Sequence, residues 1–107
     1  MKDEFYVNLK PISKAVAEFV AEKGFYTPTE IEETDALLSK LMLVVTEVGE
    51  AAEAVRHHDR ENFKEEMADT IIRVYDICGK MEIDLGRAIA DKMAVNAGRP
   101  HKHGKHA

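Results

Sequence analysis

The chain has 107 residues, a single cysteine and a formal net charge of −5 at pH 7. This length is near the commonest domain size and predicts one domain over residues 1–107. The acidic balance argues against a general nucleic-acid or membrane-surface binder, because such proteins carry a basic face. The lone Cys78 excludes an intrachain disulfide. With no signal-peptide pattern and no apolar run near the roughly 20 residues that span a bilayer, the chain is expected in the cytoplasm.

The beginning of the chain predicts a short arm followed by a helix. Residues 1–10 are expected to form an N-terminal arm, either extended or as a leading helical turn. Residues 11–23 are predicted to be helical and to stop at Gly24, because their apolar residues recur with a spacing of three and four. Thr27-Pro28-Thr29-Glu30 has the residue types of a helix start, and Thr34 offers a second start further on.

Two longer helical segments follow, joined by a turn near residues 56–62. In the first, apolar residues at three–four spacing define the expected core face: Leu37, Leu38, Leu41, Val45, Val48, Ala52 and Val55. Asp59 can cap the second segment, whose expected buried stripe consists of Phe63, Met67, Thr70, Ile71, Val74, Ile77 and Cys78. Because the turn is short, the two helices should run antiparallel.

Asp84 is expected to cap a last helix that ends near Gly98, followed by a basic tail over residues 100–107. The residues expected to face inward are Leu85, Ala88, Ile89 and Met93. No segment of the sequence shows the strict alternation of a half-buried strand. The sequence therefore predicts an all-α fold, a bundle of four to five helices around an antiparallel central pair.

Acidic residues occur in pairs on the two central helices. Glu47 and Glu50 lie three residues apart, and so do Glu66 and Asp69 after fifteen intervening residues. Residues three apart share one face of a helix, about 5–6 Å apart at Cβ, so antiparallel packing should bring the pairs together. Four facing carboxylates repel one another unless a cation lies among them, and oxygen ligands suit Mg²⁺ or Mn²⁺. We therefore expect all four acids to be metal ligands.

A strip of polar residues follows on the last helix. Lys92, Asn96 and Arg99 are spaced by four and then three, so they line one side. A cation, an amide and a guanidinium on one strip can hold phosphate oxygens, and arginine often does so with two parallel bonds. This strip predicts contact with a phosphorylated ligand.

Taken together, these residues resemble the MazG-like group of all-α nucleoside triphosphate pyrophosphohydrolases. The matching motifs are Glu47-x-x-Glu50, a fifteen-residue spacer, Glu66-x-x-Asp69 and, one helix later, Lys92-x-x-x-Asn96-x-x-Arg99. The tail Arg99-Pro100-x-Lys102-His103-Gly104-Lys105 is similar to the endings of small single-domain members. The resemblance extends over residues 37–105.

The resemblance implies Mg²⁺-dependent hydrolysis of an NTP or dNTP between the α- and β-phosphates, with Mn²⁺ as a possible substitute. It implies that the four acids hold the metal, that Lys92, Asn96 and Arg99 contact the triphosphate, and that the chain forms a homodimer or homotetramer with a shared base pocket. Glu47 or Glu50 would accept the proton of the attacking water. Many relatives have two adjacent glutamates where this chain has Thr46 and Glu47, so the number of metals stays open.

Other functions fit parts of the pattern. A phosphoribosyl-ATP pyrophosphohydrolase shares the paired-acid helices, although the tail and the order of the Lys/Asn/Arg strip favour the MazG-like group. A di-iron carboxylate bundle would need Glu-x-x-His on two helices, which neither acid motif contains. The non-enzyme alternative is a helical dimerisation or regulatory module that binds nucleotides without hydrolysing them.

Plainer interpretations exist for single residues. The acids could form a solvated face with intrahelical pairs such as Glu66 with Arg73. Glu53 is expected to lie behind the metal ligands or at the surface, and not to bind the metal directly. His101 and His103 lack the further ligands and the rigid setting of a structural zinc site.

Overall fold

The computed structural model describes residues 2–24 and 34–99. They form a 3₁₀ helix and four α-helices: η1 (Lys2–Phe5), α1 (Lys10–Lys23), α2 (Thr34–Arg56), α3 (Arg60–Lys80) and α4 (Leu85–Ala97). These residues contain no strand, so the predicted all-α fold is confirmed. None of these helices is both long and apolar enough to cross a membrane. The predicted helix start at Thr27–Glu30 and the tail from Pro100 onward lie outside the described residues.

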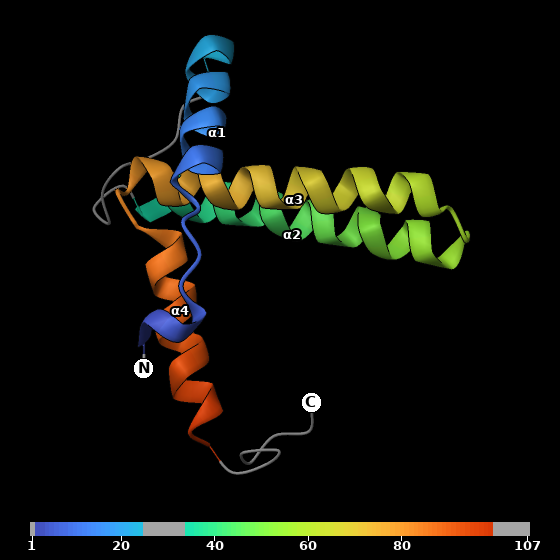
Figure 1. The fold of residues 1–107 in the computed structure, drawn as a ribbon. Coiled ribbons are helices and arrows are strands. Elements are labelled where there is room, and N and C mark those ends of the chain that lie inside the picture. Colours follow the sequence, from blue (N-terminus) through green and yellow to red (C-terminus); the bar gives the residue numbers. More distant parts are fainter. Residues whose placement is uncertain (1, 25–33, 100–107) are drawn as a thin grey trace.

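The antiparallel pair of α2 and α3 is the centre of the fold. The two helices lie side by side, α1 crosses α3, and α4 leads away from the pair (Figure 1). Only residues 57–59 separate the end of α2 from the start of α3, and so short a connection makes the helices antiparallel neighbours. The predicted central pair is therefore present.

Capping residues begin α3 and α4 where the sequence predicts. The side chain of Asp59 accepts a hydrogen bond of 3.0 Å from the backbone N–H of Asn62, and Asp84 accepts one of 3.0 Å from that of Arg87. Each aspartate thereby satisfies one of the N–H groups that a helix start leaves unpaired. Gly24 follows the end of α1 with a φ of 75°, in the left-handed region that favours glycine.

The buried apolar residues come from all four α-helices. They are Val20 of α1, Ala51 and Ala54 of α2, Tyr75 and Ile77 of α3, and Ala90 of α4. The two alanines of α2 lie on the same side as Glu47, which is the side that packs against α3. Their small side chains let the two backbones approach closely at this contact.

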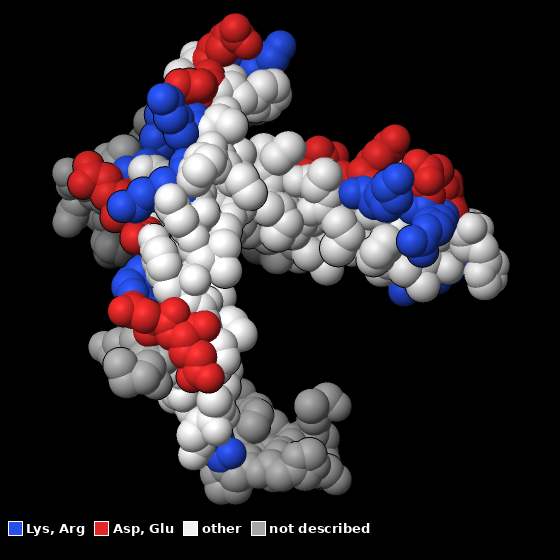
Figure 2. Space-filling model, viewed as in Figure 1, with Lys and Arg blue, Asp and Glu red and all other residues white. Residues whose placement is uncertain are grey.

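The expectation that the long apolar stripe of α2 forms the core of this chain is wrong. Its members Leu38, Leu41, Val45, Val48 and Val55 are between 45% and 58% exposed. The reason is that α3 packs against the other side of α2, which carries Glu47 and the buried alanines. On α4, Ile89 and Met93 were expected to face inward but are also more than 40% exposed. Figure 2 shows that uncharged side chains cover much of the surface facing the angle between α4 and the α2–α3 pair.

The N-terminal segment is held against α4 by Arg87. Its Nη1 donates a 2.8 Å hydrogen bond to Asp3, and its guanidinium lies 4.9 Å from the centre of the Tyr6 ring. Gly86 makes this approach possible, because a Cβ at that position would collide with the backbone oxygen of Val7. The segment of η1 thus packs on α4.

Gly86→Ala should loosen this packing, because the added methyl group would force the backbone at Val7 away from α4. We expect a loss of about 1–3 kcal/mol in the free energy of unfolding, measured by denaturant titration at fixed protein concentration. Gly79→Ala is the matched control, since a Cβ there meets nothing within 4 Å. Equal stabilities of the two variants would contradict the close contact.

Candidate functional site

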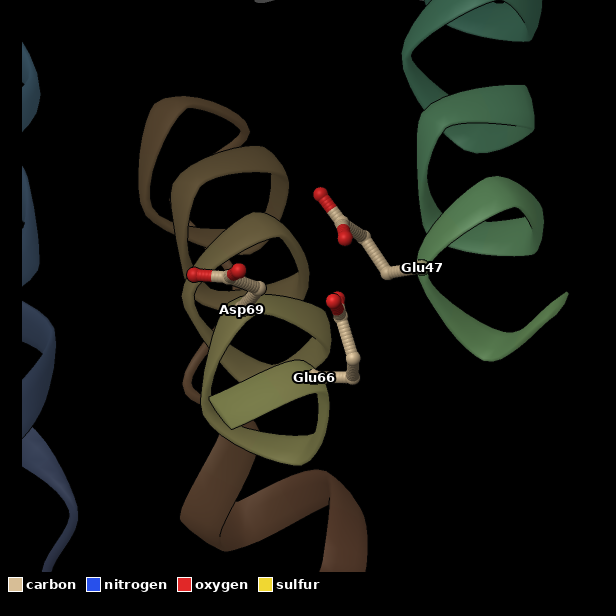
Figure 3. A group of neighbouring side chains, drawn as sticks. All are labelled: Glu47, Glu66 and Asp69. Atoms are coloured by element: carbon tan, nitrogen blue, oxygen red, sulfur yellow. The ribbon is translucent and has the colours of Figure 1, made fainter. Parts of the chain in front are cut away.

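Three of the four predicted acids meet between α2 and α3. One carboxylate oxygen from each of Glu47, Glu66 and Asp69 lies within 4.8 Å of the others. The Glu47 side chain extends from α2 toward α3, which carries Glu66 and, one helical turn later, Asp69 (Figure 3). The antiparallel packing that the sequence predicts thus brings the two acid motifs together.

Glu50, the fourth predicted acid, lies at the edge of this group. Its side chain is exposed, one turn along α2 from Glu47. It is nevertheless close enough to Glu66 for its charge and its hydrogen bonding to raise the pKa of that carboxyl group. The acid pairs therefore form one cluster with a buried side at Glu47 and an open side at Glu50.

Crowding of negative charge changes the pKa of Glu66 more than that of the other acids in the cluster. Burial, together with the neighbouring carboxyl groups of Glu47 and Glu50, raises its pKa to about 7. Its Oε1 atom is buried and has no hydrogen-bond partner among the described residues. A buried carboxylate oxygen without a donor is stabilised by a proton or a cation. The cluster consists only of carboxylate oxygens, so it fits a hard divalent ion such as Mg²⁺ or Mn²⁺.

Arg73 pairs with Glu47 across the two helices. Its Nε lies 2.8 Å from Oε2 of Glu47, whose side chain is only 11% exposed. This hydrogen bond is the main reason that the pKa of Glu47 lies below its usual value. The spacing in the sequence suggested Arg73 only as an intrahelical partner of Glu66, so this contact was missed.

A small pocket adjoins the acid cluster on the side of α1. Its volume is about 230 Å³, below the roughly 300–1,000 Å³ of most small-molecule sites, so it can take part of a ligand. The apolar side chains that line it are those of Phe19, Val20 and Ile72, and the polar ones are those of Glu47, Asp69, Arg73 and Asp76. Asp76 is a buried carboxylate, 9% exposed.

The pocket was not predicted from the sequence, although residue spacing on α3 indicated part of its wall. Glu66, Asp69, Arg73 and Asp76 are spaced by three, four and three, which places all four on one face of α3. The role of α1 had no comparable signal, because its apolar residues suggested only packing.

The predicted phosphate-binding strip lies elsewhere in the chain. Lys92 and Asn96 are exposed on α4, and Arg99 is exposed just after it. Helix α4 packs chiefly against η1 and leads away from the α2–α3 pair. A single copy of the chain therefore does not bring the strip to the acids.

Comparison with known protein families gives one finding. The family model described as MazG nucleotide pyrophosphohydrolase domain matches residues 35–103, which is more than half of the chain. The matched range contains α3 and α4, nearly all of α2, the acid cluster, Arg73 and the strip on α4. No curated protein and no solved structure matches the chain.

The raised pKa of Glu66 predicts an unusual pH dependence of stability. The folded protein binds a proton on Glu66 more tightly than the unfolded chain does. Protonation of Glu66 therefore stabilises the fold fully below the ordinary glutamate pKa of 4.5, and this stabilisation is lost as the pH rises through about 7. Glu66→Gln removes this loss. With a chelator present, the Tm of Glu66→Gln minus the Tm of the original protein should therefore be larger at about pH 8 than at about pH 5.

Glu65→Gln is the matched control, because Glu65 is an exposed neighbour in the same helix. Its Tm difference from the original protein should show no such rise with pH. Addition of Mg²⁺ or Mn²⁺ should raise the Tm of the original protein more at about pH 8 than at about pH 5, because protons and metal compete for the same oxygens. Parallel pH curves for the original protein and Glu66→Gln would contradict this account of the cluster.

Proposed function

The chain belongs to the MazG nucleotide pyrophosphohydrolase domain family, and from this premise we propose that it hydrolyses a nucleoside triphosphate between the α- and β-phosphates. The substrate would be an NTP or a dNTP, the products a nucleoside monophosphate and pyrophosphate, and the cofactor Mg²⁺, with Mn²⁺ as a substitute. The observation that carries the proposal is the convergence of Glu47, Glu66 and Asp69 within 4.8 Å beside a pocket.

In this proposal Glu47, Glu50, Glu66 and Asp69 hold the divalent ion. When bound, the ion would neutralise charge on the phosphate oxygens, which is a large part of catalysis in phosphoryl transfer. The residues of α2 and α3 fix the reacting phosphate in position, because they lie on rigid helices whose relative placement is set by the α2–α3 contact. The pocket beside Asp69 would receive a part of the nucleotide.

A carboxylate must also accept the proton of the attacking water, and Glu50 is the better placed of the two candidates. Glu47 is tied to Arg73, and its lowered pKa makes it a weaker base. Glu50 is exposed at the open side of the cluster, where water can reach it. We therefore assign proton transfer to Glu50 and metal binding alone to Glu47.

The strip of Lys92, Asn96 and Arg99 would bind the triphosphate of a site in another copy of the chain. Two observations support a homodimer or homotetramer. The first is that the strip and the acids lie apart within one chain. The second is the exposed apolar stripe of α2, which is more extensive than the scattered apolar residues of a monomer's surface. A second copy would cover this stripe and complete the site.

Turnover should depend on Glu50 and Asp69. Glu50→Gln removes the proposed proton acceptor and Asp69→Asn removes a metal ligand, so each should lower kcat by about 100-fold or more while the helical circular-dichroism signal persists. The assay is pyrophosphate release from a panel of NTPs, dNTPs and phosphoribosyl-ATP with Mg²⁺ or Mn²⁺. Glu53→Gln is the control, because Glu53 pairs with Arg56 on the exposed surface of α2 and should leave kcat within about twofold. If Glu50→Gln or Asp69→Asn keeps full activity, the substituted residue is not part of the site.

Association should depend on the stripe of α2. Val45→Asp places a charge on this exposed apolar face and should convert the oligomer to a monomer without activity, as measured by light scattering and pyrophosphate release. Ser39→Asp, at an exposed polar position of the same helix, should leave both the oligomer and its activity unchanged. A monomeric original protein that is fully active would contradict the shared site.

Mixing two inactive variants tests the same arrangement directly. In an equal mixture of Lys92→Ala and Asp69→Asn copies, mixed dimers contain one intact site built from the acids of the first copy and the strip of the second. Activity should recover to roughly a quarter of the original level, since half the dimers are mixed and each has one intact site of two. If both sites form within single chains, no recovery occurs.

A further inference from the structure

Arg73 already binds one of the residues that the divalent ion would use. Its guanidinium lies 2.8 Å from Glu47, and Glu47 is one of the three acids that converge between the helices. A cation placed among these carboxylates therefore comes close to the positive charge of Arg73. Two cations on one carboxylate repel each other, so metal binding must weaken the pair of Arg73 with Glu47.

The pocket gives the side chain of Arg73 room to turn from Glu47. Arg73 forms part of the pocket wall, and its side chain is 35% exposed, so it is not enclosed by packing. Asp76 lies three residues further along the same face of α3 and lines the same pocket. Its carboxylate is therefore an acceptor on the wall toward which the guanidinium can turn when it leaves Glu47.

We propose that Arg73 is a substrate-binding residue that neutralises Glu47 in the metal-free protein and binds the phosphate groups of the nucleotide once the metal has displaced it. The inference rests on the proposed function. A guanidinium can bind two phosphate oxygens at once through parallel N–H groups, which suits a triphosphate entering beside Glu47 and Asp69. Metal and nucleotide then favour each other's binding, because each removes a contact that opposes the other.

The metal half of the proposal is tested without nucleotide, by calorimetric titration with Mn²⁺. Arg73→Met should bind Mn²⁺ about three- to tenfold more tightly than the original protein, because the competing cation is gone. Lys64→Met is the matched control. It removes the same charge from the same helix, but Lys64 pairs with the exposed Glu61 and lies two residues before Glu66, on the other side of α3. If Arg73→Met binds Mn²⁺ no more tightly than Lys64→Met does, the proposal is overturned.

The nucleotide half is tested at saturating Mn²⁺ with a triphosphate whose α–β bridge cannot be hydrolysed. Arg73→Met should bind this analogue about tenfold more weakly, and Lys64→Met should bind it as the original protein does. Arg73→Lys keeps the charge but not the forked geometry, so its Mn²⁺ affinity should stay near the original value while its analogue affinity falls. Unchanged analogue binding by Arg73→Met overturns the proposal.

The failure of this inference and the failure of the proposed function are distinguishable. Both titrations measure binding, whereas the proposed hydrolysis is decided by pyrophosphate release from the original protein. A protein that binds the analogue with Mn²⁺ but releases no pyrophosphate would refute the hydrolysis and leave the role of Arg73 to be decided by the two titrations. Circular dichroism of each Arg73 variant confirms that its helices are intact before its affinities are compared.

Discussion

Carboxylates that repel one another are held together in the contact of α2 with α3, and this repulsion determines the chemistry of the site. The small side chains of Ala51 and Ala54 bring the helices close, and this closeness places Glu47 opposite Glu66. Part of the cost is offset within the chain, because Arg73 neutralises Glu47, and burial beside the other carboxyl groups raises the pKa of Glu66 to about 7. A stable helical pair would not need such a cluster, since apolar residues of similar size would stabilise the contact better. Metal binding, as proposed above, would remove this cost.

Much of the fold could be predicted from the sequence, because its signals are local. The aspartates at positions 59 and 84 mark helix starts by a hydrogen bond within one turn, and the short link between α2 and α3 fixes their antiparallel direction. The meeting of Glu47 with Glu66 and Asp69 follows from the same two facts. The orientation of the apolar stripe of α2 did not follow. Periodicity shows that a helix has an apolar face, but it does not show whether α3 or another molecule covers that face.

The parts of the site that could not be predicted depend on contacts between distant segments. The partner of Arg73 is decided by the register of α3 against α2, which sets whether its guanidinium reaches Glu47 or stays beside Glu66 on its own helix. The pocket wall formed by Phe19 and Val20 depends on where α1 crosses the pair. The distance between the acids and the strip on α4 is also a matter of tertiary arrangement, because spacing along a helix gives no information about where that helix leads.

The packing of η1 on α4 has a practical consequence for work with this protein. Asp3 and Tyr6 hold Arg87, which lies on the helix that carries Lys92 and Asn96. Residues at the start of the sequence therefore influence the placement of a strip that lies almost ninety positions later. Loss of the Asp3 side chain would remove a contact that holds Arg87 of α4, without altering a single residue of the acid cluster.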